Sequence, residues 1–506
     1  AGMLAGIITG YLHTKLKIPA ILSGILTMIA LYSINLRIMG QANTPLLGES
    51  TVISIVKGFL PAASTLGLKD STLQNWVILF VGLVFAAVMI GILYWFFGTE
   101  LGSGIRATGS NEAMVRAQGE DTDRMKIYGL VISNGLIALS GGLVTQTQGY
   151  ADVGMGVGAI VVGLASIVIG EVILHKKISF AAKLTSIVLG SVIYRIVIAV
   201  VLQLGLNTND MKLLTAIIVT IALSVPVLKK NKVIIAISSF IHRVVNLIKR
   251  KLGIVNTINE KQVLKGVNLQ LNPGDFVSII GGNGAGKSTM LNMIAGVHFA
   301  DMGSIVLDGV DITLLPEYVR AQYLGRVFQD PMMGTAADME IEENLALAYR
   351  RGKKRGFRWG ITKEEKEIFV DKLKTLDLGL ETRLTSKVGL LSGGQRQALT
   401  LLMATLQKPK LLLLDEHTAA LDPKTANKVL ELTDQIVAAN SLTALMVTHN
   451  MKNAIQYGNR LIMMHQGNII YDVAGEEKKK LQVTDLLSKF EMASGEEFAN
   501  DRMILS

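Results

Sequence analysis

The sequence predicts two unlike halves: a bundle of membrane-spanning α-helices, followed by an α/β half in which helices surround a parallel β-sheet. Three observations lead to this prediction. Half of the residues are apolar and the mean hydropathy is +0.43, which is too high for an ordinary soluble chain of 506 residues. The apolar residues are concentrated before about residue 228. The rest of the chain is richer in charge and contains strand-length apolar runs next to glycine-rich turns.

The first half contains apolar runs of spanning or near-spanning length. A helix needs about 20 residues to cross the hydrocarbon core, so most of the runs qualify and the first is short. The runs fall at about 1–12, 19–36, 76–97, 127–145, 157–174, 181–204 and 212–228. The chain has no cysteine, which excludes disulfides and cysteine-ligated metals.

The basic residues orient these helices. Placing His13–Lys17 inside also places residues 98–126, 175–177 and 229–230 inside, as expected from the excess of Lys and Arg in cytoplasmic loops. The formal net charge of +10 is attributed to this bias, and no nucleic-acid partner is expected. The chain is thus predicted to be a multi-pass protein of the cytoplasmic (inner) membrane with its second half in the cytoplasm. Because residue 1 falls on the outer side at the start of a helix, we expect that one or two upstream helices have been lost.

Three segments of the first half and its boundary leave alternatives open. Residues 104–119 of the inside loop carry charges of both signs and predict a helix that docks in a groove of a cytoplasmic domain; a solvated loop is the alternative. Arg195 interrupts an apolar helix and must face protein or water, either in a structural role, bonding helix-end carbonyls or Asp152, or in the translocation path. The basic amphipathic segment 232–251 fits a membrane-surface helix, a linker or the first strand of the second half.

A glycine-rich turn lies between the apolar run Phe276–Ile280 and a helix-like run that starts at Met290. A strand, a glycine-rich turn and a helix in this order are typical of a P-loop, in which backbone N–H groups and the helix N-terminus bind phosphate. Lys287 is expected to reach the β- and γ-phosphates, and the Ser288 hydroxyl to bind Mg²⁺. The predicted nucleotide-binding residues of this turn are Gly281, Gly282, Asn283, Gly284, Ala285, Gly286, Lys287, Ser288 and Thr289.

Two further strands end in polar side chains. Leu411–Leu414 is fully apolar and is followed by Asp415, expected to hold Mg²⁺ through water, and by Glu416, expected to polarise an attacking water. His449 follows another strand, at the edge where open α/β sheets bind ligands, although a lone histidine there is more often structural. A second glycine-rich turn, Leu391–Gln395, precedes a helix. Two phosphate-binding turns for one nucleotide imply a dimer in which each turn meets a nucleotide held by the other copy.

Residues from about 254 to 475 resemble the ATPase domain of ABC transporters. The resemblance implies ATP and Mg²⁺ as cofactors, with the nucleotide sandwiched between two copies. It assigns catalytic roles to Glu416 and His449, and it makes Gln329 a nucleotide- and metal-binding residue that links the γ-phosphate to the membrane helices. The resemblance also implies a signature motif that binds the nucleotide of the partner chain, formed by Ser392, Gly393, Gly394 and Gln395. Asp422 is the corresponding D-loop residue.

The first half resembles, more loosely, the permeases of branched-chain amino acid and ribose importers, in residues 106–119 and in the glycine-rich segment 154–170. The resemblance makes the inside loop a coupling helix that pushes on the ATPase, with Arg106, Glu112 and Arg116 as its coupling residues. Glu112 and Arg116 are four residues apart and so share a helical face. The predicted domains are a permease (1–228), a basic amphipathic linker (229–253) and an ABC ATPase (254–506).

These features together predict an ATP-driven importer. Two chains would accept a small polar solute, in first place an amino acid, from an extracytoplasmic binding protein. Sugars and nucleosides are the alternative substrates. An exporter is disfavoured because no long charged helical extensions occur, and a regulatory or nucleic-acid ATPase is disfavoured by the adjoining spans and by the absence of a basic stripe.

Overall fold

The computed structural model describes residues 1–46, 48–61, 69–156, 159–173, 180–203 and 262–494. These residues form two compact units. The helical unit contains the described residues up to Phe96 and from Ile127 to residue 203, and the α/β unit contains Phe97–Lys126 and the residues from 262 onward. The predicted span 212–228, the linker 229–253 and the basic residues at 175–177 and 229–230 lie outside the described residues.

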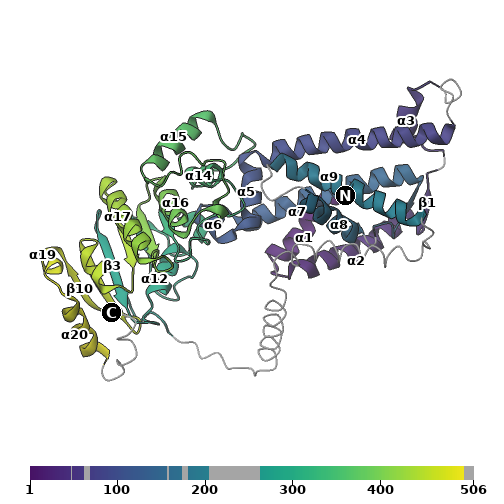
Figure 1. The fold of residues 1–506 in the computed structure, drawn as a ribbon. Helices are drawn as coiled ribbons and strands as arrows, with labels where there is room; N and C mark the ends of the chain where they lie inside the picture. The colour runs from purple at the N-terminus through teal and green to yellow at the C-terminus, as the bar shows by residue number, and fades with distance from the viewer. Residues whose placement is uncertain (47, 62–68, 157–158, 174–179, 204–261, 495–506) are drawn as a thin grey trace. The chain divides into compact units, whose positions relative to one another are not determined.

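The helical unit consists of α-helices and one small antiparallel sheet (Figure 1). In the sheet, β1 (Asn43–Pro45) pairs with β2 (Tyr150–Asp152), and Thr44 lies opposite Ala151. The helices are α1 (Gly2–Thr14), α2 (Ala20–Met39), α3 (Val52–Gly58), α4 (Asp70–Phe97), α7 (Thr122–Gln148), α8 (Ala159–Ile173) and α9 (Phe180–Gln203).

Four helices within the described residues are long and apolar enough to cross a membrane, namely α2, α4, α7 and residues Phe180–Val200 of α9. They coincide with four of the predicted apolar runs. The described parts of α1 and α8 have 13 and 15 residues, fewer than the roughly 20 that a span needs. Large apolar side chains such as Trp76 and Phe80 of α4 are exposed, as expected of helices that face lipid.

Small residues set the packing of α8 against α9. A Cβ atom at Gly190 would lie 2.0 Å from the Ser166 carbonyl oxygen, and one at Gly170 would lie 2.3 Å from that of Ser186. Such close approach of two backbones is typical of helix pairs in membranes. Arg195 is exposed on α9, and no hydrogen bond or ion pair joins it to Asp152 or to any other described residue.

The α/β unit is organised around a six-stranded sheet in the order β10-β9-β3-β8-β7-β6 (Figure 1). Five strands are parallel, and β10 pairs antiparallel with β9 at the edge. The strands are β3 (Phe276–Gly281), β6 (Leu324–Val327), β7 (Leu411–Asp415), β8 (Ala444–Val447), β9 (Arg460–His465) and β10 (Asn468–Ala474). A separate hairpin pairs β4 (Val306–Leu307) with β5 (Val310–Asp311).

The two faces of the sheet are both covered, which explains the unbroken apolar run of β7. Leu411 and Leu413 pack on the side of α12, whereas Leu412 and Leu414 pack on the side of α16 and α17. The helices of this unit are α5 (Glu100–Ser110), α6 (Glu112–Ala117), α12 (Lys287–Ala295), α13 (Glu317–Arg320), α14 (Ile341–Tyr349), α15 (Lys363–Lys374), the 3₁₀ helix η2 (Val388–Leu390), α16 (Gly393–Thr405), α17 (Pro423–Ala439), α18 (Met451–Gln456), α19 (Gly475–Lys479) and α20 (Val483–Ser494).

The inside loop forms two helices instead of one, and both belong to the α/β unit. The break falls at Asn111, whose extended backbone ends α5 and whose side chain caps α6. Ala107, Met114 and Val115 are buried in an apolar cluster with Leu345 of α14. The α5–α6 segment (Glu100–Ala117) is therefore packed into the core of this unit, and the alternative of a solvated loop is wrong.

Candidate functional site

The glycine-rich turn joins β3 to α12. All six residues of β3 are buried, and Gly284 and Gly286 adopt φ angles of 78° and 98°, a region that residues with a Cβ atom rarely occupy. The turn thus reaches the first residue of α12, Lys287, in a conformation that glycine makes possible. The Lys287 ammonium is buried and donates hydrogen bonds to the carbonyl oxygens of Gly281 at 2.6 Å and Gly282 at 3.1 Å.

Ser288 faces the carboxyl end of β7. Its hydroxyl donates to Asp415 Oδ1 at 3.2 Å. Burial raises the pKa of Asp415, and the hydrogen bond from Ser288 opposes this rise. A hydroxyl, a carboxylate and an amide oxygen such as that of Gln329 are the hard donors that Mg²⁺ takes, and Mg²⁺ is usually held by one or two carboxylates together with phosphates. The donor set therefore fits Mg²⁺.

Glu416 connects two of the other predicted site residues. Its Oε1 lies 2.6 Å from His449 Nε2, and its Oε2 accepts a hydrogen bond from Gln329 Nε2 at 3.1 Å. The Glu416 backbone has a φ angle of 44°, in the left-handed region that non-glycine residues rarely occupy. Backbone strain of this kind clusters at functional sites because the surrounding structure must hold it in place. The structure thus brings Glu416, His449 and Gln329 together at the edge of the sheet where Ser288 meets Asp415.

The second glycine-rich turn is the N-terminus of α16. Ser392 and Gln395 cap each other: Ser392 Oγ accepts from Gln395 N at 3.3 Å, and Gln395 Oε1 accepts from Ser392 N at 3.2 Å. A Cβ atom at Gly394 would lie 2.1 Å from Thr425 Cγ2, so α17 requires glycine there. Asp422 caps α17 by accepting from Thr425 N at 3.1 Å.

The signature residues and the glycine-rich turn of β3 are not joined within one chain. None of Ser392, Gly393, Gly394 and Gln395 has a hydrogen bond to residues 281–289 in the part of the chain that the structure describes. Ser392 and Gly393 are exposed. This face of α16 is therefore accessible to a second molecule.

Asn111 joins the α5–α6 segment to the residues that follow Gln329. Its Oδ1 accepts from Met114 N at 3.1 Å and caps α6. Its Nδ2 donates to the carbonyl oxygens of Met332 at 2.9 Å, Met333 at 3.1 Å and Thr335 at 2.9 Å. One side chain thus fixes both the start of α6 and the backbone three to six residues beyond Gln329.

The three predicted coupling residues separate into two groups. Arg106 Nη1 reaches Glu343 Oε1 of α14 at 2.7 Å, across the interface between the α5–α6 segment and the ATPase half. Glu112 instead pairs with Arg116 at 2.7 Å and with Lys126 at 2.8 Å, inside the loop itself. Burial raises the pKa of Glu317 of α13, and Arg116 lies close enough for its charge to oppose this rise. Glu112 and Arg116 therefore stay predicted coupling residues, and Arg106, Asn111 and buried apolar residues make further contacts with the ATPase.

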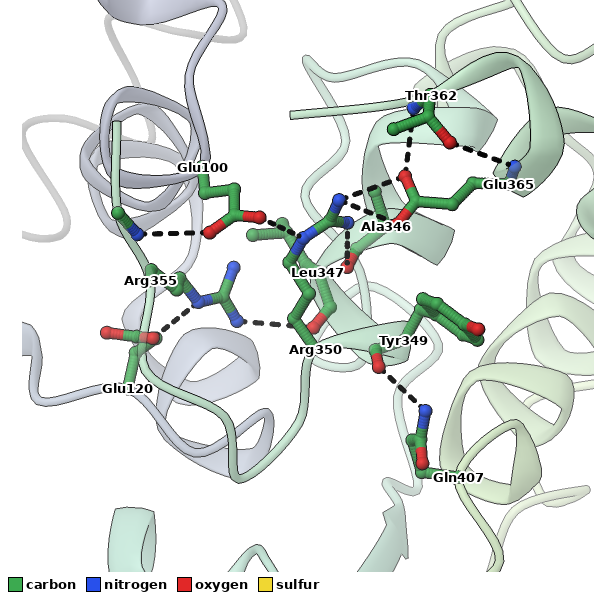
Figure 2. Close-up of polar contacts among 11 residues, drawn as sticks. Glu100, Glu120, Ala346, Leu347, Tyr349, Arg350, Arg355, Thr362, Glu365 and Gln407 are labelled. Atoms are coloured by element: carbon green, nitrogen blue, oxygen red, sulfur yellow. Dashed lines mark hydrogen bonds and ion pairs between the residues drawn. The ribbon is translucent and has the colours of Figure 1, made fainter. Parts of the chain in front are cut away.

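Two largely buried ion pairs flank this interface (Figure 2). Arg350 Nε donates to Glu100 Oε1 at 3.0 Å while its Nη2 donates to Glu365 Oε1 at 2.8 Å. Arg355 Nε donates to Glu120 Oε1, and the two side chains are 2% and 11% exposed. Burial raises the pKa of Glu120 against the attraction of Arg355, and burial lowers the pKa of Arg355. Both ends of the loop are thus tied to the residues that follow α14.

Sequence reasoning missed Asn111 and these ion pairs. For Asn111 a signal existed, since asparagine directly before Glu112 is a typical N-cap with an acidic first helical turn. The partners of Glu100 and Glu120 lie 250 and 235 residues away along the chain, and no local pattern marks them.

Comparison with known proteins yields two family matches. Residues 264–419 match the family described as ABC transporter, and residues 1–224 match the family described as branched-chain amino acid transport system / permease component. A tyrosine transport ATP-binding protein of Clostridioides difficile is 49% identical over 231 residues, which are 46% of this chain and 92% of that protein. The chain belongs to the ABC transporter family. It combines a permease domain with an ATPase domain of the importer type.

Two more distant matches cover the same half of this ABC transporter chain. A xylose/arabinose import ATP-binding protein of Sulfolobus acidocaldarius is 33% identical over 45% of this chain and 89% of its own length. A solved ATP-binding cassette of an ABC transporter in its ADP conformation is 30% identical, with a TM-score of 0.40, over 48% of this chain and 96% of that chain. The predictions of an ABC transporter with a helical permease and an α/β P-loop ATPase are confirmed. The chain binds and hydrolyses ATP and is a membrane protein.

Proposed function

We propose that the chain couples ATP hydrolysis to the import of an amino acid, which it receives from an extracytoplasmic solute-binding protein. One observation carries the coupling: the α5–α6 segment, which continues directly from the apolar helix α4, is built into the ATPase unit, with Asn111 bonded to the backbone that follows Gln329. Such a contact links the ATPase to a segment that is continuous with an apolar helix, which favours a role in transport over a role as an independent ATPase. We place the ATPase unit on the cytoplasmic side of the inner membrane, where ATP is available.

The substrate class rests on the relatives. The permease match and the tyrosine transport relative at 49% identity both favour an amino acid. The xylose/arabinose relative, at 33% identity, makes a sugar the second candidate. The substrate class is tested by measuring uptake into liposomes that contain the chain, with its solute-binding protein added. The panel of solutes contains amino acids, among them tyrosine, as well as sugars and nucleosides. Saturable uptake of a sugar or nucleoside but of no amino acid would overturn the proposed substrate class.

Hydrolysis is assigned to the residues around Glu416. We propose that the Glu416 carboxylate accepts hydrogen bonding from a water molecule and polarises it for attack on the γ-phosphorus of ATP. The new bond joins the water oxygen to phosphorus, the water proton passes to the Glu416 carboxylate, the bond from phosphorus to the β–γ bridging oxygen breaks, and ADP carries away the electron pair. His449 and Gln329, which contact the two Glu416 oxygens, orient the carboxylate and sense the γ-phosphate.

Lys287 and the glycine-rich turn are assigned to the phosphates. When ATP binds, the Lys287 ammonium exchanges the carbonyl oxygens of Gly281 and Gly282 for phosphate oxygens, which are the better partners for a buried cation. Ser288, Asp415 and Gln329 are assigned to Mg²⁺, which supplies positive charge to the β- and γ-phosphates when it is bound. Asp415 is suited to this role because burial, which raises its pKa, makes a nearby cation favourable.

The signature residues are assigned to the nucleotide of a second chain. These residues, Ser392, Gly393, Gly394 and Gln395, form a helix N-terminus, which favours an anion. Ser392 and Gly393 are exposed, and none of the four is hydrogen-bonded to the glycine-rich turn of its own chain within the described residues. Asp422 caps the neighbouring helix α17 and is assigned to the same dimer interface. A homodimer would complete two such sites.

Mixing two inactive variants is expected to restore hydrolysis. In a heterodimer of a Ser392→Arg chain and a Lys287→Ala chain, one site carries both defects and the other carries none. About half of the native phosphate release should return, because one of two equivalent sites is intact. Two affinity tags purify the heterodimer, and each homodimer serves as an inactive control. No recovery in the purified heterodimer would contradict sites that turn over independently and are shared between chains.

The Asn111→Asp variant is expected to uncouple transport from hydrolysis. Aspartate retains the oxygen that caps α6, but it replaces the amide donor by an acceptor that faces the carbonyls of Met332, Met333 and Thr335. Leaving such groups unsatisfied costs about 1–3 kcal/mol, which lowers the equilibrium constant for docking by roughly 5- to 160-fold. Solute-stimulated hydrolysis and uptake should fall accordingly, while basal hydrolysis persists.

The Glu112→Gln/Arg116→Gln double variant tests the other two predicted coupling residues in the same assays. Basal hydrolysis should persist while solute-stimulated hydrolysis and uptake fall, and normal transport would remove Glu112 and Arg116 from coupling. Loss of basal hydrolysis in Asn111→Asp would show that the contact holds the ATPase together instead of transmitting motion.

A further inference from the structure

The loop between α14 and α15, residues 350–362, combines basic and aromatic residues that the proposed function does not use. From Arg350 to Gly360 it contains six cations, two aromatic residues and no acidic residue. Three of the cations are structural. Arg350 pairs with Glu100 and Glu365, and Arg355 pairs with Glu120 (Figure 2). Arg351 donates to the backbone carbonyls of Ala404 and Gln407.

The other half of the loop faces outward. Lys353, Lys354 and Arg358 are exposed, and so are the two aromatic side chains, with Phe357 63% and Trp359 50% exposed. Cations and aromatic rings alternate along this exposed part of the loop. Rings of this size are rarely left so exposed in succession unless the surface meets an apolar or interfacial partner.

Backbone hydrogen bonds fix where this surface lies. Glu100 N donates to Arg358 O at 3.0 Å, Leu101 N donates to Gly356 O at 3.1 Å, and Gly360 N donates to Gly98 O at 2.8 Å. The partners Gly98, Glu100 and Leu101 directly follow α4, which ends at Phe97. Helix α4 is long and apolar enough to cross a membrane. The α14–α15 loop is therefore hydrogen-bonded to the first residues that follow this apolar helix along the chain.

We propose that the exposed face of the α14–α15 loop, made of Lys353, Lys354, Phe357, Arg358 and Trp359, binds the headgroup region of anionic lipid. The chemistry of the face matches this partner. Aromatic residues with a polar edge prefer the membrane–water interface, and juxtamembrane Lys and Arg are attracted to anionic lipids. The ion pairs of Arg350 and Arg355 hold the loop in place. Lys353, Lys354 and Arg358 stay exposed, although Lys353 Nζ also lies 5.0 Å from the centroid of the Tyr349 ring. Lipid binding by this face holds the ATPase unit against the membrane surface beside its coupling segment.

Trp359 provides a direct test. The chain has three tryptophans, so a Trp76→Phe/Trp95→Phe variant leaves Trp359 as the only one. The full chain is reconstituted in vesicles of phosphatidylcholine with about one third phosphatidylglycerol and a nitroxide on the headgroups of a fraction of the lipid. Headgroup nitroxide should quench Trp359 at least about twofold more strongly than a nitroxide deep in the acyl region, as expected of an interfacial aromatic residue.

The control places a tryptophan elsewhere on the same unit. Met492 of α20 is 81% exposed, and a Met492→Trp variant that lacks the three native tryptophans reports quenching away from the loop. Equal headgroup quenching of Trp359 and of this control would overturn the proposal. Lys353→Gln/Lys354→Gln/Arg358→Gln, which leaves the buried arginines intact, should reduce Trp359 quenching, as should omission of phosphatidylglycerol. If neither the triple variant nor the omission of phosphatidylglycerol changes the quenching of Trp359, the proposal that the partner is an anionic lipid is wrong. The readout needs neither ATP nor solute, so it is independent of the proposed transport activity.

Discussion

Glu416→Gln is expected to slow ATP hydrolysis by about 10²-fold or more while ATP still binds. Glutamine retains the shape of the side chain and one of the two oxygens, but it cannot act as a base toward the attacking water. The new amide NH2 replaces an oxygen that contacts either His449 or Gln329, so two donors face each other there unless the His449 imidazole changes tautomer. The orientation of the side chain at position 416 should therefore also change. Steady-state phosphate release and binding of a fluorescent ATP analogue measure the two effects separately.

The same chemical change at a remote position is the control. Glu431 lies exposed on α17, and Glu431→Gln should leave phosphate release unchanged. Near-native turnover of Glu416→Gln would remove Glu416 from its proposed role. Loss of ATP binding together with turnover would show that the carboxylate maintains the shape of the site, which the left-handed φ of 44° at Glu416 makes sensitive to substitution.

Removing one member of the Glu120–Arg355 pair should be the most damaging change to the α/β unit outside the nucleotide site. Glu120→Ala leaves the Arg355 guanidinium, 2% exposed, with the Leu347 carbonyl as a hydrogen-bond partner and with Glu100 as the remaining nearby carboxylate. Breaking a buried pair in this way costs about 3–5 kcal/mol. We expect a lower unfolding temperature of the unit and rapid proteolysis within residues 97–126.

Two further variants separate charge from packing. Glu120→Ala/Arg355→Met removes both charges and should recover much of the loss, because the cost comes from the unpaired cation. Glu112→Ala/Arg116→Ala removes a pair whose side chains are 38% and 42% exposed, and such pairs contribute roughly 0–1 kcal/mol. If the Glu120→Ala chain unfolds at the native temperature, the buried pair is not what anchors the loop.

The nucleotide half could be predicted from the sequence because its signals are local. The turn from Gly281 to Thr289 needs glycines at fixed offsets, and β7 is buried on both faces, so its apolar run is unbroken and its end at Asp415 is visible. These constraints act within a few residues along the chain. They therefore locate the elements and the polar side chains at their ends.

The contacts of the α5–α6 segment could not be predicted in the same way. The charge pattern correctly indicates a helical segment that docks on the ATPase, and it includes Arg106, whose partner Glu343 is 237 residues away. It also favours Glu112 and Arg116, because a pair four residues apart has the same appearance whether it faces a partner or closes on itself. Choosing between these requires the surface of α14, which only the folded chain provides.

The α5–α6 segment is synthesised long before the part of the ATPase on which it packs. At a synthesis rate of about 5–20 residues per second, residues 97–126 leave the ribosome tens of seconds before α14, α15 and α16 are complete. During that interval the docking surface for Ala107, Met114 and Val115, which includes Leu345 and Phe369, does not yet exist. We expect the apolar face of the nascent segment to be shielded during this time by the membrane interface or by a chaperone. The ATPase then folds around a segment that was synthesised earlier. Expressed without residues 97–126, the ATPase half would carry an uncovered apolar surface and an Arg355 without Glu120, while Arg350 would keep Glu365 as its ion-pair partner, so we expect the isolated half to aggregate.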